Sequence, residues 1–428
     1  MNKYVISDFT KIEELVSFET GEKVLKEEEL NKVKKICENI ESKIQKGDIT
    51  TVGEHNVKEW ETKFYDSRSG FMQGCVGVVK FEDVELIIKT RFDDFTPQKD
   101  VKPYFLFLMF EEFLQSYSEN FENTFAYDEY LQLLLMILFK QKLQAAASKT
   151  IFRQYVKREY NDFNIKGAID FKRHIRENIT QRSGKIAYNT TEWTVDNPIN
   201  HLILYTYERI KNTCNEMWQK LFSSDTEMKK LIDFYKTEIG MRKNLQRTMK
   251  LCEKPIRNSL YADYEEIRKL CFKILQNIGV DIFASTNDDT QAILFYVPDL
   301  WEKFLEHHFF SGTKLKPQDP FTKCGFLMRP DFVLDDAVYD AKFKDEIKQT
   351  DFYQIVTYMT AKGFHKCGAI QPVKESDEQK TAPDDINDRH DKFVKIKIQV
   401  PGINEMGYQN WKTKFIQNVR SVAGATLS

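Results

Sequence analysis

Two aspartates and a lysine lie close together in the last third of the chain. Their types and spacing could form a site that cleaves phosphodiester bonds. Asp331 follows a proline, and Asp340 begins the sequence DAKFK, which contains Lys342. Neighbouring carboxylates repel each other unless a cation lies between them, and oxygen ligands open to phosphate suit Mg²⁺. A metal held there would polarise a phosphate and lower the pKa of the attacking water. The lysine could hold or deprotonate that water, or stabilise charge on the phosphate.

Both acids lie in apolar runs that predict neighbouring strands. The runs are FLMRPDFVL (326–334) and AVYDAKFK (337–344), and two aspartates between them favour a turn. Side chains alternate along a strand, so Asp340 and Lys342 share one face, and a hairpin would bring Asp331 beside Asp340. The competing interpretation is a solvated face of an edge strand. The apolar setting argues against it, because an idle carboxylate there would be costly.

Predicted helices on either side add three candidates to this site. DLWEKFLEHHF (299–309) carries Glu302, a third acidic group and, with Asp331 and Asp340, a predicted metal ligand. TDFYQIVTYMTAKG (350–363) carries Gln354 and Tyr358 four residues apart, and therefore on one helical face. The pair could position the lysine or the DNA backbone. A tyrosine in an amphipathic helix is as often a core residue, so both interpretations stand.

The pattern along the chain predicts an α+β multidomain protein with three regions. Residues 1–95 combine a charged helix (28–46) with a β-hairpin and form a β-rich unit. Residues 96–285 are mainly helical. Residues 286–428 alternate helices and strands and carry the acidic site.

Local patterns define the elements inside these regions. The hairpin strands are 74–81 and 84–92, the long middle helices are 103–116 and 128–147, and the later strands are 292–297, 367–373 and 393–400. From Arg153 to Asp196 the pattern is short, mixed and turn-rich, with Trp193 interpreted as a core residue. A new helix is predicted to start at Pro198. The polar stretch 374–392 is predicted to be a mobile loop.

Composition limits the class of protein. The 63 basic and 65 acidic residues nearly balance, so a DNA-binding surface must be local or supplied by a partner. Seven scattered cysteines without a CxxC argue against a disulfide framework, a zinc site or an iron–sulfur cluster. No signal peptide is evident and the longest apolar run, 133–139, is too short for a membrane span, so a cytoplasmic location is expected. The absence of a GxxxxGK[ST] sequence predicts no nucleotide-hydrolysing site.

The quoted residues resemble a known nuclease family. RPDFVL, DAKFK and DFYQIVTY resemble the PD-(D/E)xK superfamily with a RecB-type QxxxY helix. The likeness is greater to the McrC family, the nuclease subunit of McrBC-type modification-dependent restriction systems. QAILFYVPDLWEKFLEHHF resembles the helix before that family's catalytic strands, with Glu302 at its acidic position. YNDFNIKGAIDF and YNTTEWTVDNPINHLIL resemble its central signature, around Gly167, Asp196 and Asn200.

The likeness spans most of residues 70–373, since GCVGVVKFEDVELIIKTRF also resembles the family's N-terminal β unit. Two departures bear on partner contacts. Lys166-Gly167 stands where the family often has Arg-Gly, and Lys89-Thr90 stands where it usually has Pro-Lys.

The resemblance implies a C-terminal mixed-sheet, restriction-endonuclease-like domain and a Mg²⁺-dependent endonuclease of antiviral defence, with Mn²⁺ as a substitute. It implies a partner, a McrB-like AAA+ GTPase hexamer that recognises modified double-stranded DNA and translocates it. Residues 1–95 would then be the partner-contact region. Two other functions remain open: a non-catalytic adaptor that activates an AAA+ GTPase, and a solitary RecB-like repair nuclease.

Overall fold

A computed structural model describes the chain in two compact units. The described residues are 2–45, 51–52, 64–81, 83–97, 100–114, 125–179, 184–213, 218–219, 222, 225–240, 244–277, 290–317, 319–377, 383–386, 391–403 and 406–427. One unit comprises residues 1–134 and 286–428, and the other comprises residues 135–285. Both contain helices and strands, so the predicted α+β class is confirmed. None of the helices in the described residues is long and apolar enough to cross a membrane.

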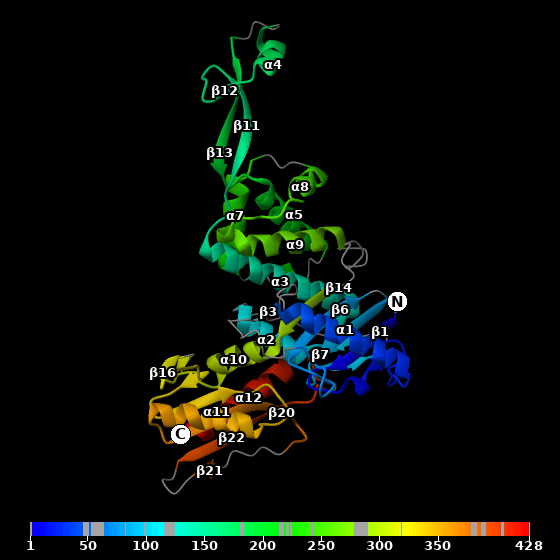
Figure 1. Ribbon diagram of the computed structural model, residues 1–428, viewed down its shortest axis with the longest axis vertical. Coiled ribbons are helices and arrows are strands. Elements are labelled where there is room, and N and C mark those ends of the chain that lie inside the picture. Colours follow the sequence, from blue (N-terminus) through cyan, green and yellow to red (C-terminus); the bar gives the residue numbers. More distant parts are fainter. Residues whose placement is uncertain are drawn as a thin grey trace. The chain divides into compact units, whose positions relative to one another are not determined.

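The first unit contains a six-stranded sheet in the order β2-β1-β7-β6-β14-β3. Its strands are β1 (Asn2–Ser7), β2 (Val16–Ser17), β3 (Thr51–Val52), β6 (Cys75–Phe81), β7 (Val84–Lys89) and β14 (Thr290–Tyr296). The predicted hairpin is confirmed as β6 and β7. The antiparallel pairing of β14 with β6 joins the first and last regions of the sequence in one sheet. Helix α1 (Glu27–Gln45) lies beside this sheet (Figure 1) and buries an apolar stripe around Val33, Ile36 and Ile40.

A second six-stranded sheet in the same unit has the order β15-β18-β19-β20-β22-β21. Its strands are β15 (Lys316–Pro317), β18 (Phe332–Val333), β19 (Ala337–Ala341), β20 (Lys366–Lys374), β21 (Pro383–Asp385) and β22 (Lys392–Val400). β18 and β19 are antiparallel, whereas β19, β20 and β22 are parallel. The predicted helix is α11 (Gln349–Lys362), which connects β19 to β20 and ends at Gly363, where the backbone is left-handed.

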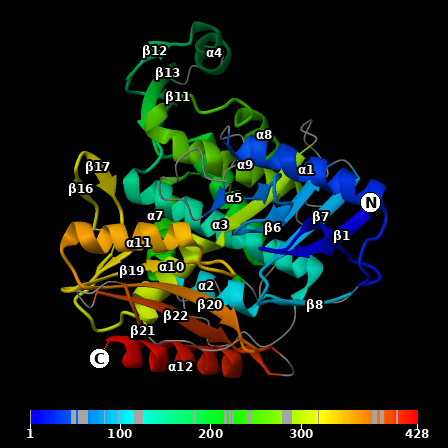
Figure 2. The same cartoon turned by 60° about the horizontal axis from the view of Figure 1, so that its bottom comes forward.

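Two helices cover opposite faces of this sheet, α11 on one and α12 (Tyr408–Leu427) on the other (Figure 2). Helix α12 was not predicted, although its buried residues recur at helical spacing: Tyr408, Trp411, Phe415, Val419 and Val422. In the stretch 374–392, expected to be a loop, β21 pairs with β22. Of the rest of this stretch, the structure describes residues 374–377, 386 and 391–392.

The run 326–334 is not one strand. Phe326–Met328 (β17) pairs with Phe321–Lys323 (β16) in a separate hairpin, and β18 is only two residues long. Pro330 lies between them and has no backbone N–H for a sheet ladder, which explains the break. The prediction of a continuous strand was therefore wrong, although Asp331 still directly precedes β18.

Aromatic side chains fill the core beside this sheet. Helices α2 (Tyr104–Leu114) and α10 (Val297–His308) contribute Phe105 and Trp301, whose ring centroids lie 6.2 Å apart. Phe415 of α12 stacks on Phe304 of α10 at 5.5 Å. Helix α10 is thereby fixed by rings on several sides, which in turn fixes the position of Glu302. The described residues of this unit also form the short strands β4 (Tyr65–Asp66), β5 (Phe71–Met72), β8 (Asp94–Thr96), β9 (Asp100–Lys102) and β10 (Phe125–Ala126), and the 3-10 helix η1 (Ile12–Glu14).

In its described residues, the second unit consists mainly of helices and a long hairpin. The helices include α5 (Pro198–Thr213), α7 (Thr226–Glu238), α8 (Leu245–Leu251), η3 (Ser259–Tyr261) and α9 (Ala262–Asn277). The part of α3 (Tyr127–Lys149) that follows residue 134 also belongs to this unit. The start of α5 at Pro198 confirms the prediction. The nine-residue strands β11 (Gln154–Asp162) and β13 (Ile186–Thr194) replace the short, mixed pattern expected there.

Trp193 corrects a second expectation. It was interpreted as a core residue, but its side chain is 46% exposed and packs against Tyr155 across the hairpin, with ring centroids 4.8 Å apart. A two-stranded ribbon leaves both faces near solvent, so large side chains pair across it instead of entering a core.

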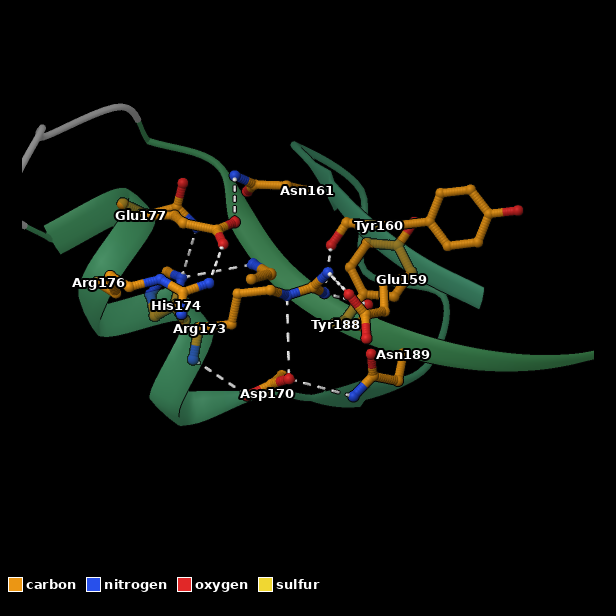
Figure 3. Close-up of polar contacts among 12 residues, drawn as sticks. Glu159, Tyr160, Asn161, Asp170, Arg173, His174, Arg176, Glu177, Tyr188 and Asn189 are labelled. Atoms are coloured by element: carbon orange, nitrogen blue, oxygen red, sulfur yellow. Dashed lines mark hydrogen bonds and ion pairs between the residues drawn. The ribbon is translucent and has the colours of Figure 1, made fainter. Parts of the chain in front are cut away.

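A short cap closes the far end of this hairpin (Figure 3). It contains β12 (Ala168–Ile169), α4 (Phe171–His174) and a π-helical turn η2 (Ile175–Ile179). The Arg173 guanidinium donates to the carbonyls of Tyr160 and Tyr188 at 2.9 and 2.8 Å, and so ties the cap to both strands. Asp170 caps α4 by accepting from the Arg173 backbone N–H. We call residues 163–179 the hairpin cap.

Candidate active site

The structure places Asp331 and Asp340 side by side. In the β18–β19 hairpin, Phe332 pairs with Tyr339, so the same register sets Asp331 opposite Asp340. Asp340 is 2% exposed, whereas Asp331 is half-buried at the start of the strand. One carboxylate oxygen of Asp331 accepts the Ala341 N–H at 2.7 Å, which fixes its orientation toward β19.

The surroundings of Asp331 oppose its ionisation. Burial raises the pKa of its carboxyl well above the usual range, and the carboxylates of Asp340 and Glu302 raise it further. The ammonium of Lys342 and the Ala341 N–H act in the opposite direction but do not cancel these effects. Three carboxylates are therefore gathered where positive charge is favoured.

Lys342 supplies part of that positive charge. Its ammonium forms an ion pair with Asp340 and donates to the Gln354 side-chain oxygen at 3.2 Å. Burial lowers the pKa of Lys342, but the charges of Asp340 and Asp331 outweigh it, and the net pKa is raised. The lysine therefore stays protonated, which favours charge stabilisation over removal of a proton from water.

Gln354 and Tyr358 both take part in this network. The Gln354 amide donates to the Tyr358 hydroxyl at 2.9 Å along one face of α11, so the helix holds the glutamine that contacts Lys342. Burial raises the pKa of Tyr358. Of the two interpretations left open for this pair, the geometry favours positioning the lysine.

Glu302 lies on α10, whose first turn begins at Val297 and Pro298. Its carboxylate is close enough to Asp331 to raise the pKa of that group. The structure thus brings together all six residues predicted for the site. They come from four elements or their ends: α10, β18, β19 and α11.

Five of these six side chains, all except Tyr358, line a cleft of about 890 Å³. One wall was not predicted: Phe9, Phe71 and Gln73 from the N-terminal part of the chain face the acids. No local sequence signal could have identified them, because they lie more than 200 positions away in the chain. Lys344 also lines the cleft, although it was not among the predicted site residues. Its ammonium binds both carboxylate oxygens of Asp351, at 2.7 and 2.8 Å, at the start of α11.

The donor set can be compared with what Mg²⁺ requires. Among the described residues, no group of three or more His, Cys, Asp or Glu side chains is arranged to hold a metal ion. Mg²⁺ needs only one or two carboxylates, with water and substrate oxygens completing its shell. Asp331 and Asp340 provide that pair. One buried carboxylate oxygen of Asp340 is ion-paired with the Lys342 ammonium. The residues present therefore fit a hard cation.

Comparison with known proteins identifies the family. A family model described as McrBC 5-methylcytosine restriction system component matches residues 72–368. The chain belongs to the McrBC family. The resemblance stated from the sequence is thereby confirmed. No curated protein matches the chain.

Two solved assemblies from Thermococcus gammatolerans are distantly similar. A half-complex of a tetradecameric assembly of McrB AAA+ hexamers with bound McrC is 11% identical, covers 99% of each chain and has a TM-score of 0.48. A cryo-EM structure of the McrBC complex is 12% identical, covers 71% of this chain and 86% of the other, and has a TM-score of 0.29. At these scores, neither likeness bears on the fold or function of this McrBC-family chain.

The signature residues that pointed to the McrBC family serve the architecture of the second unit. A Cβ on Gly167 would lie 2.1 Å from the Asn189 carbonyl oxygen, so only glycine fits beside β13. Asp196 pairs with Arg158 and with His201 at the base of the hairpin. The Asn200 amide donates to the Phe152 and Val195 carbonyls at 2.9 and 2.7 Å.

Proposed function

We propose that this chain is the Mg²⁺-dependent DNA endonuclease of its McrBC-type system, with a PD-(D/E)xK site. The observation that carries the proposal is the juxtaposition of Asp331, Asp340 and Lys342 in one cleft, with the lysine ion-paired to Asp340. Idle carboxylates would not be gathered in a buried position where Asp340 and Glu302 raise the pKa of Asp331. The hairpin, crossover helix and parallel strands around them are the elements that such a site requires.

Asp331 and Asp340 would hold the metal, with Glu302 as a third ligand through water. Mg²⁺, or Mn²⁺ in its place, would polarise the phosphate and lower the pKa of a bound water. The Lys342 ammonium would bind a non-bridging phosphate oxygen. Gln354 and Tyr358 would keep that ammonium directed into the cleft.

The test is cleavage of methylated DNA by the complex reconstituted with its partner GTPase. Asp340→Ala and Lys342→Ala should each lower the cleavage rate by about 100-fold or more, as expected when a group acting on the reacting phosphate is lost. GTP hydrolysis, measured in the same samples, should be unchanged. Asp336→Ala serves as the control, because Asp336 is exposed and pairs only loosely with Lys366, at 3.5 Å. Cleavage retained by Asp340→Ala would refute the site.

We further propose that the partner is a McrB-like AAA+ GTPase hexamer and that the substrate is double-stranded DNA carrying modified cytosine. Membership of a family of 5-methylcytosine restriction components supports this. The chain has no GxxxxGK[ST] sequence of its own, and its charge is nearly balanced. Motor and recognition functions would therefore belong to another subunit.

The hairpin cap is the surface best suited to that contact. Large exposed apolar side chains gather there in the second unit: Phe163, Ile165, Ile169, Phe171, Ile175 and Ile179. Phe171, the most exposed of these side chains, is 69% exposed. Exposed apolar groups in such a cluster indicate a protein contact. Residues 1–95, first proposed for this role, expose one large apolar side chain among the described residues, Leu25.

A double substitution, Phe171→Ser with Ile175→Ser, should lower the affinity of the chain for the GTPase by at least about 10-fold. The stimulation of GTP hydrolysis by the chain should fall with it. Leu260→Ser removes an equally exposed apolar residue of the second unit outside the cap, and should change neither. If Leu25→Ser weakened binding while the cap variant did not, residues 1–95 would be the contact.

The same assays separate the alternatives. An adaptor would stimulate the GTPase while no tested DNA is cut. A solitary nuclease would degrade DNA ends without any partner.

A further inference from the structure

Arg91 is a buried arginine that the site described above does not include. It follows β7 in the N-terminal sheet, and its side chain is 5% exposed. Its backbone N–H and its Nη1 donate to the two carboxylate oxygens of Asp8, at 2.6 and 3.1 Å. Asp8 is fully buried at the end of β1. Because β1 and β7 are parallel, these residues meet at the same edge of the sheet.

The same guanidinium reaches the catalytic segment. Its Nε lies 2.7 Å from a carboxylate oxygen of Asp345, three residues after Lys342. Its plane also lies over the ring of Phe343, 4.6 Å from the centroid. Phe92 and Phe9 flank it at 4.6 and 5.0 Å. Arg91 therefore holds two alternate residues of the segment KFKD, one through its aromatic ring and one through its charge.

This contact occurs where the sheet itself stops holding the segment. β19 ends at Ala341, and the Lys342 N–H still donates to the Ile370 carbonyl at 2.8 Å. The chain then leaves the ladder while it still carries Lys344 and lines the cleft. The direction of the Lys342 side chain depends on where the backbone after it is fixed.

We infer that Arg91 is a positioning residue for the nuclease site, holding residues 343–345 so that the Lys342 ammonium stays between Asp340 and Gln354. The inference rests on the proposed nuclease function. Arg91 itself touches neither the acids nor the lysine. The N-terminal sheet is then part of the catalytic apparatus and not only a neighbouring layer.

A purely structural role is the alternative, and the two ends of the contact separate the two roles. The buried pair of Arg91 and Asp8 supports packing, so its loss would destabilise the fold. The Asp345 side chain is 58% exposed, and exposed ion pairs add little stability. Removing only the Asp345 end should leave the fold intact while it releases the segment after Lys342.

The experiment compares Asp345→Ala with Asp336→Ala in the full complex cutting methylated DNA. Both remove one exposed, ion-paired aspartate from the ends of β19, but Asp336 lies outside the cleft. Asp345→Ala should lower kcat by about 10-fold or more, since small misplacements of a catalytic group are costly. Its KM for DNA should stay within about twofold of the wild-type value, and its melting midpoint should not move. Asp336→Ala should match the wild type.

Arg91→Lys provides a second, independent variant. It keeps the positive charge but loses the planar fork that spans two carboxylates. Its kcat should fall as in Asp345→Ala. The double variant should be no slower than the slower single variant, because both substitutions remove the same contact between Arg91 and Asp345.

Three results would overturn the inference: wild-type kcat in Asp345→Ala, a fall in the kcat of Asp345→Ala matched by a lower melting midpoint of that variant, or additive losses in the double variant. Asp340→Ala, assayed alongside, tests the proposed function itself. If Asp340→Ala abolishes cleavage while Asp345→Ala cuts normally, only the role of Arg91 is refuted. If Asp340→Ala still cuts, the nuclease site fails first.

Discussion

At the scale of single residues, the lysine of the site is held by a relay from helix α11. Gln354 accepts from Lys342 and donates to Tyr358, so each group orients the next. Tyr358→Phe deletes one neutral hydrogen bond from this relay, worth about 1 kcal/mol. We expect the rate of DNA cleavage to fall about 2- to 10-fold, with DNA affinity unchanged, in single-turnover and filter-binding assays.

Helix α11 offers a matched control for this prediction. Gln349 donates to the Tyr353 hydroxyl at 2.6 Å, the same side-chain pair at the same spacing, but Gln349 does not line the cleft, whereas Gln354 does. Tyr353→Phe should therefore cut at the wild-type rate. Equal losses in both variants would mean that the effect belongs to the helix and not to the relay.

Asp93 makes the stability of the first unit depend on pH. It is buried, and its carboxylate accepts the Phe105 N–H at the start of α2. Burial raises its pKa to about 7, while a hydrogen bond from Thr90 and the charge of Lys89 oppose the rise. The folded state therefore keeps a proton that the unfolded state releases near pH 4. The contribution of Asp93 to the free energy of unfolding is therefore greatest below about pH 4. It declines as the pH rises toward 7, at up to about 1.4 kcal/mol per pH unit.

Asp93→Asn cannot titrate, so its urea midpoint should decline less than that of the wild type between pH 5 and 8. Asp8, whose pKa burial raises to about 6, contributes in the same direction and remains in the variant. Parallel pH profiles for the two proteins would show that Asp93 does not carry this dependence.

At the scale of elements, helix α12 supports the site from the far side of the sheet. Phe415 stacks on Phe304 of α10, the helix that carries Glu302. Phe415→Ala should lower the free energy of unfolding by about 3–5 kcal/mol, the usual loss for a buried phenylalanine. Arg420→Ala, on the exposed face of the same helix, should stay within about 0.5 kcal/mol. Urea denaturation measures both, and equal losses would contradict the assignment of this core.

Elements with a regular pattern and one dominant environment were predictable from the sequence. The hairpin β6–β7, the strands β20 and β22, and the helix α11 match their expected ranges closely. Elements whose form depends on distant partners were not predictable. The ribbon β11–β13 lacks a buried face that would set an alternating pattern, and β18 is cut short by Pro330.

At the scale of the whole molecule, the chain groups its residues by packing and not by order. The sequence divides into regions at about residues 95 and 285, and that division stays a prediction. The structure joins residues 1–134 with 286–428 because β14 pairs with β6 across more than 200 positions. The six candidate site residues could be grouped from the sequence because they lie within 57 residues of one another. The cleft wall from Phe9 and Gln73, and the contact of Arg91 with Asp345, depend on that long-range pairing and were not.

This grouping predicts how local damage spreads. Compact units unfold cooperatively within themselves, so a core defect should loosen its own unit first. Phe415→Ala should raise hydrogen exchange in residues 406–427 and equally in β6 and β7, which lie far away in sequence but in the same unit. Exchange in β11, β13 and α9 should stay at the wild-type level. Ile267→Ala, in the core of α9, should give the reverse pattern.

If Phe415→Ala loosened only the C-terminal segment and spared β6 and β7, the two ends of the chain would not form one cooperative unit. The N-terminal sheet could then not hold the catalytic segment as the contacts of Arg91 require.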